Sequence, residues 1–192
     1  MSLYKGVMDQ SLYFIALMLP PDVEAIADHW KQFGEKFEAK KSSNAPPHIT
    51  LQPPFQLDVL NQEKMFSFLK GVVANTPKIP VTLDGFDHFE TRIIYIDVEK
   101  TPDLLALQNH LKTEIAQQFG IKDEQYGDHP FQPHVTVAYN CLNEASFYQA
   151  WEEFKNQSLH HEFLVPELTL LKHNGRVWEV DTNFLFENAG DL

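Results

Sequence analysis

Two short segments that repeat one pattern decide the fold. Residues 45–55 read APPHITLQPPF, and residues 131–139 read FQPHVTVAY. Each contains Pro-His-apolar-Thr-apolar, and the two histidines, His48 and His134, lie 86 residues apart. Successive side chains of a β-strand point to opposite faces, so each histidine shares a face with the threonine two residues later. The apolar neighbours can then be buried while the polar pairs face the other way.

The flanking sequence alternates between strand-like and helix-like patterns. Apolar runs and period-two alternation predict strands over residues 11–19, 48–52, 79–86, 92–98, 134–139, 161–171 and 176–186. Proline pairs flank the second of these strands, so only a short strand is expected there. Helical spacing predicts helices over residues 22–37, 61–75, 101–119 and 147–154. The third helix is expected to end at Gly120, and the last two strands to be joined by a turn at Asn174-Gly175. The order β-α-β-α-β therefore occurs twice.

This duplication predicts an α+β, bilobal fold. We expect two β-α-β-α-β lobes with mainly antiparallel sheets that face a central cleft, and helices outside. Residues 1–192 would form a single domain, with lobe halves at approximately 11–88 and 89–186. If the lobes face each other, His48, Thr50 and their counterparts His134 and Thr136 converge in the cleft.

Composition limits the possible partners. Fifteen basic against 27 acidic residues give a net charge of −12, which argues against a non-specific grip on long nucleic acid. The single cysteine, Cys141, allows no internal disulfide and fits a reducing compartment. Neither a signal peptide nor a membrane-spanning run is recognisable. We expect a cytoplasmic monomer without a membrane role.

Two histidines across a cleft suit the cleavage of a phosphodiester. A neutral imidazole can take a proton from the nucleophile while an imidazolium protonates the leaving oxygen, so neither a metal nor another cofactor is required. Thr50 and Thr136 would donate hydrogen bonds to the non-bridging phosphate oxygens. The expected pH–rate profile is bell-shaped.

The paired tetrads resemble the signature of the 2H phosphoesterase superfamily, which includes 2′-5′ RNA ligase-like proteins and cyclic phosphodiesterases. Residues 47–51, followed by Pro53-Pro54-Phe55, look like the first family motif, residues 133–137 like the second, and residues 13–16 like the first strand. The resemblance implies two catalytic histidines, phosphate-binding threonines, no required metal and a 2′-phosphate product. Several relatives place an arginine two residues after the second tetrad, where this chain has Tyr139.

Other side chains near the motifs are candidates for substrate binding. Four aromatic residues could stack on a base, and two cations could pair with phosphate: Phe55, Phe89, Phe131, Tyr139, Arg92 and Lys172. His160-His161 lacks the spacing of a metal motif.

The predicted enzyme is a hydrolase that opens a 2′,3′-cyclic phosphate or a related 2′-5′ phosphodiester on RNA ends or nucleotides. Which histidine is base and which is acid stays open. The alternatives are a non-catalytic nucleotide or RNA-end binding module, a 2′-5′ RNA ligase running the reverse reaction, and a metallohydrolase.

Overall fold

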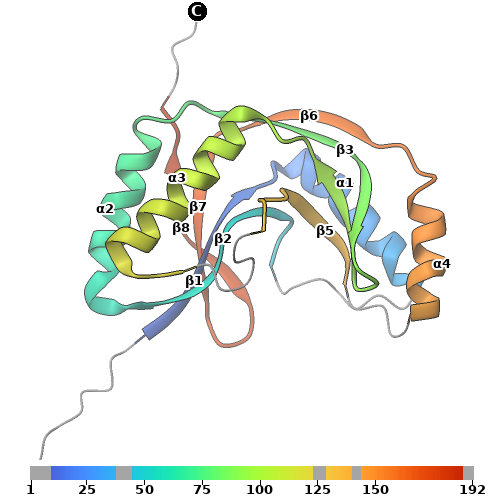
Figure 1. Ribbon diagram of the computed structural model, residues 1–192, viewed down its shortest axis with the longest axis horizontal. Helices are drawn as coiled ribbons and strands as arrows, with labels where there is room; N and C mark the ends of the chain where they lie inside the picture. The colour runs from blue at the N-terminus through green and yellow to red at the C-terminus, as the bar shows by residue number, and fades with distance from the viewer. Residues whose placement is uncertain (1–9, 38–44, 123–128, 140–143, 188–192) are drawn as a thin grey trace, which may run out of the picture.

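The computed structural model describes residues 10–37, 45–122, 129–139 and 144–187. Within these residues two four-stranded antiparallel sheets are flanked by helices (Figure 1). The strands are β1 (Gln10–Met18), β2 (His48–Asp58), β3 (Ile79–Phe89), β4 (Ile93–Val98), β5 (His134–Tyr139), β6 (His160–Val165), β7 (Glu167–His173) and β8 (Trp178–Leu185). The helices are α1 (Pro21–Glu35), the 3₁₀ turn η1 (Val59–Asn61), α2 (Gln62–Val73), α3 (Pro102–Phe119) and α4 (Glu144–Phe154). The predicted α+β class is confirmed.

Each sheet takes strands from both halves of the chain. The first sheet has the order β2-β1-β7-β8, and the second has the order β5-β4-β3-β6. The repeated β-α-β-α-β order is present, but β3 of the first repeat lies in the second sheet. The expected lobe halves, 11–88 and 89–186, therefore do not coincide with the sheets. One continuous apolar core runs through both sheets and includes Ile15, Ile96 and Phe154.

Strand β2 is longer than the proline pairs suggested. It runs through Pro53 and Pro54, so the prediction of a short strand was wrong. The pairing register with β1 shifts between Gln52 and Phe55, and the two prolines lie opposite the single residue Phe14. Proline is tolerated at such a bulge, and β2 is an edge strand that pairs only with β1, so few ladder hydrogen bonds are lost.

The single strand expected over residues 161–171 is in fact two strands. β6 is an edge strand of the second sheet, whereas β7 pairs with β1 in the first sheet. Pro166 lies between β6 and β7. Proline interrupts a ladder because it has no N–H to donate. The chain crosses between the sheets here, and the Pro166 carbonyl accepts a hydrogen bond from the Phe186 N–H at 2.9 Å. The predicted turn at Asn174-Gly175 is present, with Gly175 at φ 95°.

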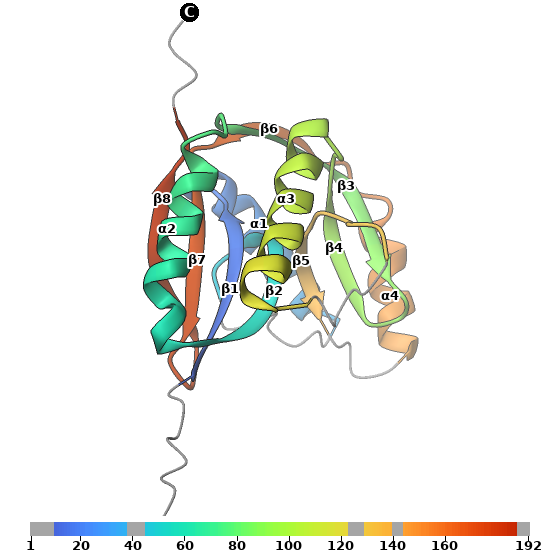
Figure 2. The same cartoon turned by 60° about the vertical axis from the view of Figure 1, so that its left-hand side comes forward.

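The helices cover the outer faces. α2 packs on the first sheet through the Phe66 and Phe184 rings, while α1 and α4 pack together beside the second sheet through Trp30 and Phe154. α2 and α4 lie at opposite ends of the molecule (Figures 1 and 2). α3 lies between them and contacts β2 and β3. Gly120 ends α3 in the left-handed conformation, as the sequence predicts. No helix in this described part of the chain is long and apolar enough to span a membrane.

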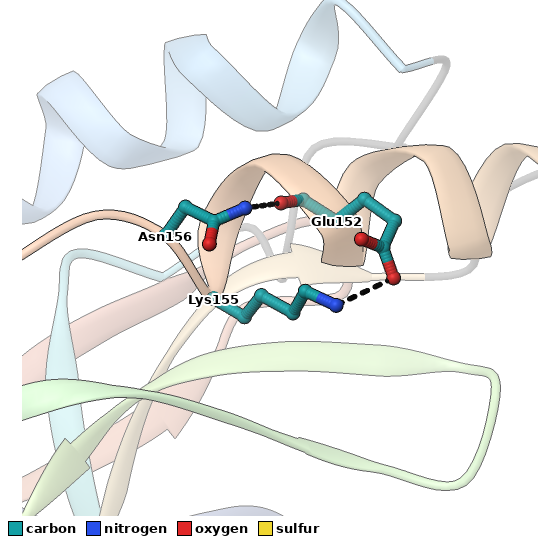
Figure 3. A network of polar contacts seen from close by, with 3 residues as sticks. All are labelled: Glu152, Lys155 and Asn156. Atoms are coloured by element: carbon teal, nitrogen blue, oxygen red, sulfur yellow. Dashed lines mark hydrogen bonds and ion pairs between the residues drawn. The ribbon is translucent and has the colours of Figure 1, made fainter.

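Surface contacts at the end of α4 hold its last turn. The Lys155 ammonium donates to the Glu152 carboxylate at 2.7 Å, and the Asn156 amide donates to the Glu152 carbonyl at 2.6 Å (Figure 3). Exposed pairs of this kind contribute about 0–1 kcal/mol. Their effect is to satisfy a carbonyl that the end of the helix leaves unpaired.

Helix α1 approaches β5 closely at Gly34. A Cβ atom there would lie 3.1 Å from the Ala138 Cβ and 3.2 Å from the Val137 carbonyl of β5. We expect Gly34→Val to destabilise the fold by about 1–3 kcal/mol through overpacking. Equilibrium urea unfolding measures this change. The matched control is Gly71→Ala on α2, where no atom lies within 4 Å of the added Cβ, and a small gain in stability is expected. An unchanged midpoint for Gly34→Val would contradict the close packing.

Candidate active site

The two histidines begin two edge strands that contact each other. His48 is the first residue of β2, His134 is the first residue of β5, and each strand pairs on one side only. Ile49, Leu51, Val135 and Val137 are at most 2% exposed, whereas the histidine and threonine of each tetrad are partly exposed. Burial of the apolar residues thus directs both polar pairs to the other face of their strands.

Both imidazoles are oriented in the same way. His48 Nδ1 lies 2.7 Å from the Pro46 carbonyl oxygen, and His134 Nδ1 lies 2.8 Å from the Gln132 carbonyl oxygen. A carbonyl oxygen only accepts, so each Nδ1 carries a hydrogen and donates it. In the neutral imidazole the other nitrogen, Nε2, therefore has a free lone pair. The two backbone carbonyls fix the tautomer that a general base requires.

His48 is held neutral. The pKa of His48 is lowered to about 4, mainly by burial; the Pro46 hydrogen bond opposes this effect, and the nearby positive charges of Lys31 and His134 add to it. The Phe14 ring lies 4.9 Å from the imidazole and belongs to a small apolar cluster on this face of the first sheet. A neutral imidazole at neutral pH can accept a proton.

His134 has a different electrostatic environment. The pKa of His134 is lowered, mainly by burial, while the hydrogen bond to the Gln132 carbonyl and the carboxylate of Asp97 oppose the lowering. Asp97 pairs with His134 across β4 and β5, and its Oδ1 accepts a hydrogen bond from the Gln132 amide at 2.8 Å. Gln132 thus links the carboxylate to the carbonyl that orients His134. A negative charge beside His134 favours its imidazolium form.

Aromatic side chains surround His134. The Phe89 ring lies 4.9 Å from the imidazole and the Tyr95 ring lies 5.1 Å from it, with the two rings 4.4 Å apart. Burial, followed by the charge of Asp87, raises the pKa of the Tyr95 hydroxyl, which stays protonated. Phe89, one of the candidate binding residues, thus contacts His134.

The other candidate binding residues lie further from the two histidines. Tyr139 is at the opposite end of β5 from His134 and is 39% exposed, and Arg92 is exposed in the turn between β3 and β4. Phe55 is in the main core and stacks on Tyr13 at 6.3 Å. Lys172 pairs with Tyr13 across β7 and β1, and its ammonium lies 5.5 Å from that ring. Phe55 and Lys172 are thus on the core side of the first sheet.

A cavity of about 560 Å³ begins at Thr50 and His134. Phe89 and Phe131 line it together with Gln108 of α3. His48 and Thr136 do not line it, so the cavity extends from one side of the four-residue site.

Four residues of the site were absent from the sequence-based candidates: Phe14, Tyr95, Asp97 and Gln132. Alternation could have found Tyr95 and Asp97, because Ile94, Ile96 and Val98 are buried on the other face of β4. No local pattern indicates that Gln132 connects two strands.

Two further sequence features are the His160-His161 pair and the single cysteine, Cys141. His160 lies on the surface 3.6 Å from Asp84 and 3.5 Å from Glu162. Among the residues that the structure describes, no group of three or more His, Cys, Asp or Glu side chains could hold a metal ion. Cys141 lies outside the described residues.

The fold and the paired tetrads define a class: bilobal α+β proteins with two His-apolar-Thr-apolar strands. The family model of the 2′-5′ RNA ligase superfamily matches residues 19–176. A protein of Geobacillus kaustophilus named "Putative phosphoesterase" is 30% identical over 177 residues, which cover 90% of this chain and 95% of that protein. A Geobacillus thermodenitrificans protein of the same name is 31% identical over 144 residues, which cover 73% of this chain and 78% of that protein.

The chain therefore belongs to the 2′-5′ RNA ligase superfamily, the 2H phosphoesterases. Solved structures show the same fold. A crystal structure of a phosphoesterase superposes with a TM-score of 0.72 and 20% identity, covering 94% of this chain and 100% of that one. E. coli LigT in complex with 3′-AMP superposes with a TM-score of 0.71 and 20% identity, over the same shares of the two chains.

The low pKa of His48 makes stability depend on pH. The pKa is about 4 in the folded state and about 6.5 in the unfolded state, so the unfolded state binds the proton first as the pH falls. Stability should decrease by up to about 3 kcal/mol between pH 6.5 and pH 4 on this account. In the variant His48→Asn the free energy of unfolding, measured in urea, should decrease less over this pH range. At pH 7.5 the difference in free energy between the variant and the unmodified protein gives the packing cost of the substitution. An equal pH dependence in both proteins would contradict the lowered pKa of His48.

Proposed function

We propose that this chain is a phosphodiesterase that hydrolyses a 2′,3′-cyclic phosphate, or a related 2′-5′ phosphodiester, on RNA ends or nucleotides. The observation that carries the proposal is the matched orientation of two imidazoles at equivalent positions of two neighbouring edge strands. Membership of the 2H phosphoesterases and the complexes of LigT with 3′-AMP, ATP and NADP⁺ support a nucleotide substrate.

The proposed reaction needs one base and one acid. The neutral imidazole takes a proton from water as the water oxygen bonds to phosphorus, and the imidazolium gives a proton to the 3′-oxygen as its bond to phosphorus breaks. The product is a nucleoside 2′-phosphate. Each turnover leaves the proton on the opposite histidine, and exchange with solvent restores the starting state.

We assign His48 as the base and His134 as the acid. Lys31 disfavours a positive charge on His48, whereas Asp97 favours one on His134. Burial lowers both pKa values in the free protein, and a bound phosphodiester anion would raise them because it stabilises the imidazolium. The bound substrate thus favours protonation of His134, which later gives this proton to the leaving oxygen.

Thr50 and Thr136 complete the proposed site. They share the exposed face of their strands with the histidines, and each pairs with a residue of the neighbouring strand, Ala16 and Tyr95 respectively. Their hydroxyls would donate to the two non-bridging oxygens, on which charge develops in the transition state.

Loss of either histidine should abolish most turnover. We expect His48→Ala and His134→Ala each to lower kcat for the 2′,3′-cyclic mononucleotides by about 10²–10⁴-fold, since each removes one proton transfer. The assay includes a chelator, and folded state is checked by circular dichroism. Activity that disappears with the chelator would favour a metallohydrolase. Binding of nucleotides without turnover would favour a binding module, and joining of supplied RNA ends would favour a ligase.

The assignment of acid and base can be tested through Asp97. Asp97→Asn removes the charge that favours imidazolium at His134 while keeping an oxygen to accept from Gln132, so the pKa of His134 should fall. Since the acid must be protonated, the basic limb of the kcat/KM profile should move to lower pH by about one unit or less. The exposed Asp84→Asn is the matched control. A shift of the acidic limb instead would reverse the assignment.

A further inference from the structure

The carbonyl that orients His134 lies outside the sheet. It belongs to Gln132 and accepts the hydrogen of His134 Nδ1 at 2.8 Å, but the pairing of β4 with β5 ends at Asp97 and His134. Residues 129–133 precede β5 and are part of neither a helix nor a strand. Strand pairing therefore places His134 itself but not the carbonyl on which the orientation of its ring depends.

The side chain of Gln132 supplies the missing connection. Its amide donates to Asp97 Oδ1 at 2.8 Å, and both residues are partly buried. A hydrogen bond to a carboxylate is shorter and stronger than one between neutral groups. Gln132 is thus attached to the sheet through its side chain, at the residue that pairs with His134.

The carboxylate of Asp97 is itself held by β4. Its Oδ1 also accepts from the Val98 N–H at 3.0 Å. β4 pairs with β3 on one side and β5 on the other, and Val98 is 1% exposed. A chain of contacts therefore runs from an interior strand through Asp97 and Gln132 to the imidazole of His134.

The first half of the site holds its carbonyl by other means. His48 Nδ1 donates to Pro46, whose ring limits its φ to about −65°. The carbonyl of the next residue, Pro47, accepts from the Leu19 N–H at 3.4 Å. Proline rigidity and a backbone hydrogen bond thus restrain the segment before His48, and Gln132 stands at the position that Pro46 occupies there.

We infer that Gln132 is a positioning residue for the acid of the proposed reaction: its amide, held by Asp97, keeps its carbonyl on His134 Nδ1, so that Nε2 points at the leaving oxygen. The inference rests on the proposed function and deepens it, because it names the group that orients the proton donor. Accurate aim matters, since a displacement of about 1 Å can lower a rate by about 10²-fold.

Nitrogen NMR of the imidazoles tests this orientation without requiring turnover. At pH 8 the lowered pKa of His134 leaves its ring neutral, and the ¹⁵N chemical shifts show which nitrogen carries the hydrogen. We expect only the Nδ1–H tautomer at His134 in the unmodified protein and a mixture of both tautomers in Gln132→Met. His48 should keep its Nδ1–H tautomer in both proteins. Spectra of His48→Asn and His134→Asn assign the signals.

Turnover of a 2′,3′-cyclic mononucleotide should show the matching defect. Gln132→Met should lower kcat by about tenfold or more and change KM by less than about twofold, because the aim of the acid matters in the transition state. Asp97→Ala removes the acceptor of the Gln132 amide. The double variant should therefore lose no more activity than Asp97→Ala alone, whereas losses that multiply would overturn the inference.

The matched control is Gln118→Met on α3. The Gln118 amide also donates to a carboxylate, Glu114 Oε2 at 2.9 Å, but on the exposed surface of the helix. This variant should leave the tautomers and kcat unchanged. A single Nδ1–H tautomer at His134 in Gln132→Met would overturn the inference. An equal change in Gln118→Met, or an equal change at His48, would also overturn it, since the effect would then be a general loosening of the fold.

The two readouts separate this inference from the proposed function. A change of tautomer confined to His134, in a protein whose unmodified form turns over no cyclic phosphate, would support the contact that orients His134 and overturn the hydrolase. Turnover that is lost in His134→Ala but unaffected in Gln132→Met would support the hydrolase and overturn the positioning role.

Discussion

Each motif strand can bury only one of its faces, and this constraint sets the direction of every reacting group. Ile49 and Leu51 of β2 and Val135 and Val137 of β5 are buried. If either strand slipped by one residue in its pairing, the histidine would enter the core and an isoleucine or valine would enter the cleft. The free energy of apolar burial, about 1.5–3 kcal/mol for each large side chain, therefore also fixes the register of the catalytic candidates.

Much of this arrangement could be predicted from the sequence, because short-range patterns carry it. The repeated tetrads predicted the two strands and the face of each histidine, and helical spacing predicted each of the four α-helices in the described part of the chain. Long-range pairing could not be predicted: nothing in residues 161–171 indicates that Pro166 separates strands of different sheets. The acidic partner of His134 was also missed. Alternation places Asp97 on the same face of β4 as Tyr95, but the strand pairing and the Gln132 amide that connect Asp97 to His134 leave no local signal.

The two halves of the site are alike in backbone and different in charge. Both imidazoles donate from Nδ1 to the carbonyl two residues earlier, so duplication of one unit explains their common orientation. Their neighbours differ, because Lys31 of α1 acts on His48 while Asp97 of β4 acts on His134. A duplicated scaffold thus supplies geometry twice, and substitutions around it can give the two copies unlike protonation.

The interleaved sheets also constrain how the chain acquires its shape during synthesis. In the first sheet β1 lies between β2 and β7, so β1 pairs with a strand that is made much later in synthesis. At about 5–20 residues per second, the roughly 150 residues between them take about 8–30 seconds to appear. Throughout that interval one edge of β1 has no partner strand. The proline bulge on β2 and the acidic composition of the chain would both lower the risk that nascent copies associate through such edges.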